Sequence, residues 1–187
     1  MKTRNLFSIM LVALVMVATT QVFAQETKMV GGAAMYPTKN IVENAVNSKD
    51  HTTLVAAVKA AGLVETLQGE GPFTVLAPTN AAFEKLPEGT VANLLKPENK
   101  KALQGVLTYH VIAGKNSAAA IIQDIEDGGG TAEWTTVNGQ KLWGMLDGEM
   151  VQIKDQAGNV ATVTIADVNQ SNGVIHVIDT VLLPEMK

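Results

Sequence analysis

Residues 163–184 read VTIADVNQSNGVIHVIDTVLLP and contain the strand around which we expect the chain to fold. From residue 174 to residue 182 the apolar side chains, many of them β-branched, occupy both odd and even positions. That pattern is typical of a central strand covered on both faces. Asn172-Gly173 favours a tight turn that would pair this strand with residues 163–165. Earlier segments must therefore supply apolar layers on both sides.

The first 24 residues are predicted to be a signal peptide. Lys2 and Arg4 precede an apolar run over residues 6–18, and Val22-Phe23-Ala24 places small residues where signal peptidase cleaves. The apolar run is shorter than the roughly 20 residues of a spanning helix. We predict cleavage before Gln25 and no stable membrane insertion afterwards, with an uncleaved anchor as the alternative.

Charge and cysteine content narrow the range of partners and compartments. The whole chain has a net charge of −4, and removal of the two basic residues of the signal leaves −6. An acidic chain argues against a nucleic-acid partner. The chain has no cysteine, so no disulfide and no lipidated cysteine is expected. We predict a secreted bacterial protein, periplasmic or extracellular, of unknown oligomeric state.

The chain divides into a helical part followed by a sheet. Residues 25–39 are rich in Gly and Ala without periodicity and are predicted to be a flexible leader to a single domain over residues 40–187. Helical spacing and capping residues dominate up to about residue 130. Asn138-Gly139 and Asp147-Gly148 then mark hairpin turns between strands. This order predicts an α+β fold.

Three separated blocks carry a family resemblance. FTVLAPTNAAF (73–83), TYHVI (108–112) and ADVNQSNGVIHVIDTVLLP (166–184) resemble the two homology boxes and the Tyr-His segment of the fasciclin domain. The resemblance spans about residues 40–184. It implies a β-wedge of antiparallel strands packed with a layer of short α-helices. It also implies a secreted, non-enzymatic adhesion module for cell-surface or matrix proteins or polysaccharides, as in cell walls and biofilms.

The same resemblance implies a set of partner-binding residues. In animal members the Tyr-His segment with its flanking aliphatic residues, and an Asp-Ile pair near the second box, have been implicated in integrin binding. Asp167-Val168 replaces the Asp-Ile pair in this chain. The predicted partner-binding residues are Tyr109, His110, Leu107, Val111, Ile112, Asp167 and Val168.

Structural roles compete with binding at several of these positions. His110 lies on the apolar stripe of a helix, where a hydrogen-bonded core histidine is the plainer interpretation, whereas Tyr109 is the better candidate for direct contact. Asp167 is expected to accept backbone N–H groups in the turn that ends at Gly173. The residues expected to serve the fold through caps and core hydrogen bonds are Thr79, Asn80, His176 and Asp179.

Catalysis and metal binding find little support in the sequence. Ser171, His176 and Asp179 are the residue types of a hydrolytic triad, but three residues separate His176 from Asp179, which places them on opposite faces of a strand. The nucleophile elbow Gly-x-Ser-x-Gly is missing from the sequence. The three histidines have no metal-ligand spacing. We therefore predict no enzyme activity, no cofactor and no metal.

Two further hypotheses stay open. Trp134 and Trp143 lie on hairpin strands. Exposed, they would stack on sugar rings or form a protein hot spot, and facing inward they would fill the wedge. An alternative function is that of a carrier, with a small apolar ligand in a cleft between the helices and the β-wedge. Met145 and Met150 could line such a cleft, because methionine adapts to irregular apolar shapes.

Overall fold

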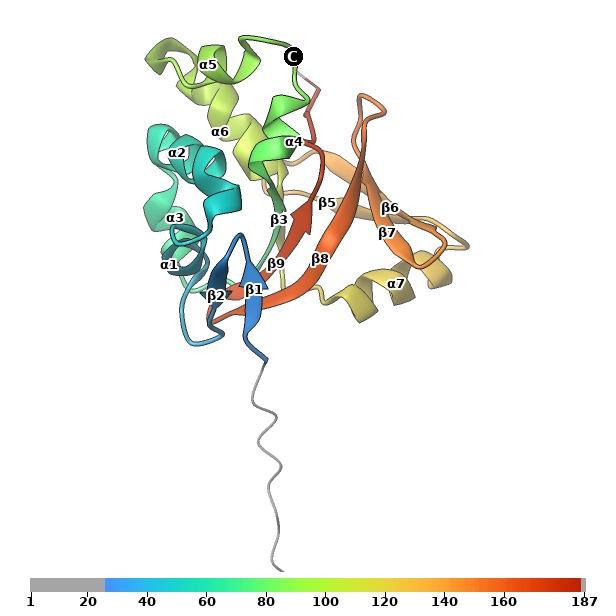
Figure 1. Ribbon diagram of the computed structural model, residues 1–187. Helices are drawn as coiled ribbons and strands as arrows, with labels where there is room; N and C mark the ends of the chain where they lie inside the picture. Colours follow the sequence, from blue (N-terminus) through green and yellow to red (C-terminus); the bar gives the residue numbers. More distant parts are fainter. Residues whose placement is uncertain (1–25, 186–187) are drawn as a thin grey trace, which may run out of the picture.

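The computed structural model describes residues 26–185. These residues are organised around one seven-stranded sheet (Figure 1). The strand order is β4-β3-β9-β8-β7-β6-β5. Only β3 and β9 run parallel, and the other neighbouring pairs are antiparallel. The strands are β3 (Phe73–Pro78), β4 (Val111–Ala113), β5 (Ala132–Thr135), β6 (Lys141–Asp147), β7 (Met150–Lys154), β8 (Val160–Gln170) and β9 (Gly173–Ile178).

The long strand β8 divides the sheet into two halves. Its register with β9 shifts between Val163 and Ile165 and again between Ile165 and Val168, and its other half pairs with β7. Such bulges bend a strand and increase its twist. The sheet curves so strongly that the residues after β5 reach β4. There Val137 N–H donates to the Val111 carbonyl at 2.8 Å, next to a bridge between Ile112 and Thr136. The two edge strands, β4 and β5, are thereby joined into a wedge.

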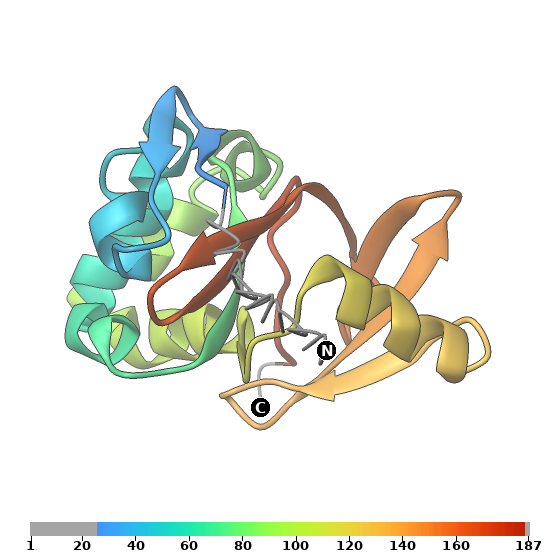
Figure 2. The ribbon, with the colours of Figure 1, turned by 90° about the horizontal axis from the view of Figure 1, so that it is seen from below.

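Most helices lie on one side of the wedge, and α7 lies apart from them against β5, β6 and β7 (Figures 1 and 2). The longer ones are three turns or less, so packing rather than intrinsic propensity holds them. The helices are α1 (Ile41–Ala45), η1 (Lys49–His51), α2 (Thr52–Ala61), α3 (Val64–Gln68), α4 (Asn80–Glu84), α5 (Thr90–Leu94), η2 (Pro97–Asn99), α6 (Lys100–Tyr109) and α7 (Ala118–Asp127).

Local sequence signals set several helix ends. Asn40 and Glu43 form a capping box at α1, with their side chains bonded to each other's backbone N–H at 2.9 and 2.8 Å. Thr79 caps α4 by accepting from Ala82 N–H at 3.2 Å. Gly62 ends α2 in the left-handed conformation with φ of 73°. The cap at Thr79 confirms the structural role expected for that residue.

Strand β9 is buried at every position, which confirms the predicted central strand. Ile175 and Val177 face the core beneath the helical layer, together with Val75 of β3. Ile178 faces the second core, formed with α7 and the other half of the sheet, as does Leu76 of β3. Because the two faces of β3 and β9 belong to different cores, apolar residues are required at both odd and even positions of these strands.

The expected flexible leader over residues 25–39 is wrong for most of its length. Strands β1 (Lys28–Val30) and β2 (Ala33–Met35) pair as an antiparallel hairpin, and Val30 and Met35 are only 2% and 3% exposed. Lys28 Nζ donates to the Ala166 carbonyl at 2.7 Å. Strands of three residues are too short to show periodicity in sequence. The predicted signal peptide lies outside the described residues.

The Gly31-Gly32 turn explains why this hairpin forms. Both residues have positive φ, of 58° and 75°, which glycine adopts without strain. The Gly31 carbonyl accepts from Lys49 N–H at 3.1 Å, and a Cβ on Gly31 would collide with Ser48 Oγ. Glycine at this position therefore lets the hairpin approach η1 closely.

Two methionines of the hairpin provide a matched test of its role. We expect Met35→Ala to lower the free energy of unfolding by about 2 to 5 kcal/mol, because it removes buried core volume. Met29 is 62% exposed, and Met29→Ala should change stability by less than about 0.5 kcal/mol. Urea unfolding measures both values, and equal small effects would contradict a packed hairpin.

Candidate functional site

Tyr109 lies at the C-terminal end of α6 and is fully buried. Its hydroxyl donates to the Lys141 carbonyl at 2.8 Å and accepts from Gln156 N–H at 3.2 Å. Burial raises the pKa of Tyr109 to about 12. The phenol therefore stays neutral and ties α6 to β6 and to the turn that follows β7.

His110 follows Tyr109 and is also buried. Its Nδ1 donates to the Val106 carbonyl at 2.8 Å, and its Nε2 accepts from Leu182 N–H at 3.0 Å. This pair of bonds requires the neutral ring with the proton on Nδ1. Burial lowers the pKa of His110 to about 4, so the ring is neutral near pH 7. His110 joins the end of α6 to the C-terminal segment.

The predicted partner-binding surface is mostly interior. A buried side chain cannot contact a partner while the domain keeps this fold, so direct binding by the Tyr-His segment is wrong for this structure. Tyr109 and His110 have structural roles in its place. The other predicted binding residues that are buried are Leu107, Val111, Ile112 and Val168.

Asp167 is the half-buried exception among these residues. It occupies the β8 bulge with φ of 53°, and its carboxylate accepts from Ala118 N–H at 2.8 Å at the start of α7. Its own N–H donates to His176 Nδ1 at 3.3 Å, and His176 Nε2 contacts the Asn116 carbonyl at 2.8 Å. Asp167 therefore orders the loop before α7. The sequence had led us to expect that it would order the turn that ends at Gly173.

The other predicted structural residues also connect distant elements. Asn80 accepts from Thr53 N–H at 3.0 Å and donates to the Lys49 carbonyl at 2.8 Å, which joins α4 to the start of α2. Asp179 accepts from Thr162 N–H at 2.8 Å and pairs with Lys85 at 3.3 Å. His176 and Asp179 thus point to different partners and do not form a dyad.

The two tryptophans lie on opposite faces of the sheet. Trp134 pairs across the strands with buried Leu142, packs over Gly144 and donates to Asp124 of α7 at 3.0 Å. It fills the wedge. Trp143 pairs with exposed Glu133 and donates to its carboxylate at 3.2 Å, so its half-buried ring belongs to the outer face.

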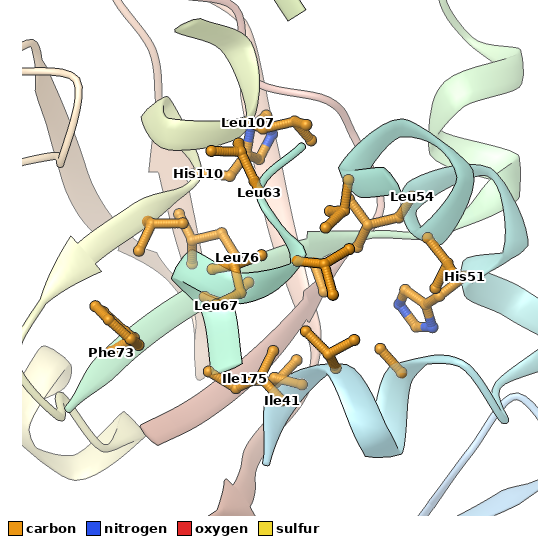
Figure 3. Close-up of a pocket in the computed structure, with 18 of the residues that line it drawn as sticks. Ile41, His51, Leu54, Leu63, Leu67, Phe73, Leu76, Leu107, His110 and Ile175 are labelled. Atoms are coloured by element: carbon orange, nitrogen blue, oxygen red, sulfur yellow. The ribbon is translucent and has the colours of Figure 1, made fainter. Parts of the chain in front are cut away.

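A narrow apolar cavity of about 80 Å³ lies between the helical layer and the sheet (Figure 3). Its walls come from α1, α2, α3 and α6 on one side and from β3 and β9 on the other. Leu54, Leu67 and Ile175 are among the lining residues. Met145 and Met150 do not line it, and Met150 is exposed. The cleft of the carrier hypothesis therefore exists without the methionines proposed for it.

An open groove of about 470 Å³ lies on the surface beside α4 and α5. Phe83, Leu86 and Val91 supply an apolar floor, and Glu84 and Glu88 line it with carboxylates. No sequence pattern indicated this groove, because its residues come mainly from two short helices and the turn between them, with Thr53 from α2. Within residues 26–185, no cluster of His, Asp or Glu is suited to hold a metal ion.

A family model of the fasciclin domain matches residues 49–184. The chain belongs to the fasciclin domain family. The three sequence blocks that resembled this family lie within the matched range, whereas the β1–β2 hairpin and α1 precede it. The resemblance found in the sequence and the α+β wedge that it implied are both confirmed.

Relatives cover most of this fasciclin domain. Protein sll1483 of Synechocystis sp. (strain ATCC 27184 / PCC 6803 / Kazusa) is 48% identical over 162 residues, which cover 87% of this chain and 83% of that protein. Cell surface glycolipoprotein MPB83 of Mycobacterium bovis is 37% identical over 162 residues, 83% of this chain and 64% of that protein.

A solved structure has the same fold. It is a FAS1 domain pair from the insect cell adhesion molecule Fasciclin I, with a TM-score of 0.68 and 15% identity over 80% of this chain and 51% of that chain. At this identity the likeness concerns the fold alone. No helix among residues 26–185 has the length and apolar character needed to cross a bilayer.

The Tyr109 hydroxyl can be tested against an exposed tyrosine. We expect Tyr109→Phe to lower the free energy of unfolding by about 1 to 3 kcal/mol, because the Lys141 carbonyl and Gln156 N–H lose a buried partner. Tyr36 is 45% exposed, and Tyr36→Phe should have little effect. Chemical denaturation compares the two, and an unchanged stability of Tyr109→Phe would refute the structural role.

The buried histidines predict a loss of stability in mild acid. His110 titrates near 4 when folded and near 6.5 when unfolded, so the unfolded chain binds more protons between these values. Its contribution is complete above pH 6.5 and decreases as the pH falls. Between pH 7 and pH 5 the loss from His110 should be about 2 kcal/mol.

His51 and His176 act in the same direction, because burial lowers both of their pKa values. Urea unfolding at pH 7, 6 and 5 measures the combined effect. A free energy of unfolding that stays constant over this range would show that the histidines are accessible to protons in the folded state.

Proposed function

We propose that this fasciclin domain is an exported, non-enzymatic adhesion module that binds a cell-surface or matrix protein or polysaccharide through the groove beside α4 and α5. The groove is the observation that supports this site. An apolar floor with Phe83 and Leu86, bordered by the carboxylates of Glu84 and Glu88, has the composition of a recognition surface with an apolar centre and a polar rim.

The relatives support the adhesive class of function. One of them, at 37% identity, is described as a cell surface glycolipoprotein. The residues that could otherwise suggest hydrolysis are engaged in the fold, since His176 bonds the loop before α7 and Asp179 bonds Thr162 and Lys85. These observations favour binding over catalysis.

The acidic rim favours a partner with complementary chemistry. Glu84 and Glu88 are exposed, so their carboxylates can accept hydrogen bonds from hydroxyl or cationic groups. Polysaccharide hydroxyls and basic protein side chains both meet this requirement. Since exposed charge pairs contribute modestly, the apolar floor should supply most of the affinity.

Two exposed alanines provide a matched pair for the test. Ala92 lines the groove on α5, and Ala81 lies on α4 outside its lining. Ala92→Arg places a long charged side chain in the groove, whereas Ala81→Arg adds the same side chain elsewhere. We expect Ala92→Arg to reduce capture from source-cell surface and matrix extracts at least tenfold, with Ala81→Arg unchanged.

Both variants are first checked for folding by circular dichroism and thermal melting. Equal capture by the two variants would exclude the groove and direct attention to Trp143 on the outer sheet face. If the unmodified protein captures nothing from either extract, the adhesive function itself is wrong.

A further inference from the structure

The cavity beneath the helical layer contains a polar atom whose hydrogen bonding is incomplete. His51 lies at one end of the cavity in the view of Figure 3, and Phe73 lies at the other. The His51 side chain is buried, with 2% of the residue exposed. Ser48 Oγ is 2.9 Å from its Nδ1, but its Nε2 has no partner.

This nitrogen is exceptional among the buried side chains. Within residues 26–185, His51 Nε2 is the one buried side-chain nitrogen or oxygen without a hydrogen bond. The Ala77 backbone lies near enough to the ring to raise the pKa of His51, but burial has the larger effect and lowers that pKa. The geometry at Nε2 does not meet that of a hydrogen bond. The ring is therefore neutral near pH 7 and has one unused nitrogen at the cavity.

Water is a poor partner for this nitrogen. A buried water is held by two to four hydrogen bonds, roughly three on average. Two other polar side chains of the lining are already engaged: both nitrogens of His110 are bonded, and Thr108 Oγ1 donates to the Gln104 carbonyl at 2.7 Å. Most of the remaining lining side chains are apolar, with Met35, Leu54 and Ala77 among them.

The cavity reaches the surface between short helices. Lys59 of α2 and Thr66 of α3 are exposed and also belong to its lining, and Val42 and Val55 are half-buried. The buried part of the lining holds no charged side chain, since Lys59 lies at this opening. An occupant would therefore have to be uncharged where it is enclosed.

We propose that the cavity binds a compact apolar molecule with one hydroxyl group, which hydrogen-bonds to His51 Nε2. A hydroxyl both donates and accepts, so it satisfies Nε2 in either neutral tautomer. The volume is about half of the roughly 150 Å³ that admits benzene, which restricts the enclosed part of the ligand to a few carbon atoms. Any longer portion would extend through the opening at Lys59.

This internal site is independent of the proposed adhesive groove. The two sets of lining residues have no member in common. Loss of ligand binding in the cavity and loss of partner capture by the groove are therefore separate results. Either proposal can fail without the other.

The probe for the test is 1-butanol, with 1-chlorobutane as its counterpart without a hydroxyl group. Titration of histidine-labelled protein followed by nitrogen NMR reports on His51 Nε2 directly. We expect 1-butanol to shift this resonance saturably and 1-chlorobutane to bind without the hydrogen-bond shift. Absence of a saturable change with 1-butanol in the folded protein would overturn the proposal.

A cavity-filling substitution tests the location. Ala45 of α1 lines the cavity, and Ala56 is exposed on α2 outside it. We expect Ala45→Leu to weaken 1-butanol binding at least tenfold, because leucine occupies the space, and Ala56→Leu to leave it unchanged. Equal affinities for the two folded variants would place the ligand elsewhere.

Removal of the nitrogen tests the recognition. His51→Phe should weaken 1-butanol binding about tenfold and leave 1-chlorobutane binding unchanged, because only the alcohol loses a hydrogen bond. The same loss for both probes would overturn the role of Nε2. If His51→Phe does not fold, the shifts of Nε2 with the two probes in the unmodified protein decide, and identical shifts refute the proposal.

Discussion

The burial of β9 on both faces is the constraint on which the rest of the domain depends. A strand whose residues are buried at every position cannot lie at the surface, so one layer must cover each side. The helices α1, α2, α3 and α6 cover one side, and α7 with β5, β6 and β7 covers the other. The bend of β8 allows one sheet to supply both the central strand and part of its cover.

The layers are held together by buried hydrogen bonds, and Tyr109 and His110 make two of them. Each side chain bonds backbone groups far away in sequence, at Lys141 and Leu182 respectively. A buried polar side chain is costly unless it is bonded, so these positions tolerate few alternatives. Residue types that suggest recognition in a sequence thus hold the fold here.

Much of the fold was predictable from the sequence, because its signals are local. The β9 pattern, the caps at Asn40 and Thr79, and the hairpin turns depend on neighbouring residues. The β1–β2 hairpin was missed because three-residue strands have no measurable period. The burial of Tyr109 was missed because it depends on groups at residues 141 and 156. His51 offered no signal, since an isolated histidine becomes notable only when the structure shows its unpaired nitrogen.

The hydrogen bond between Val137 and Val111 has a consequence for how these domains associate. An open sheet exposes backbone donors and acceptors that recruit strands from other molecules, which leads to uncontrolled polymerisation at high local density. Here a bridge and one backbone hydrogen bond connect β4 with the segment after β5, so part of this template is occupied. Contacts between such domains then depend more on side chains than on strand pairing.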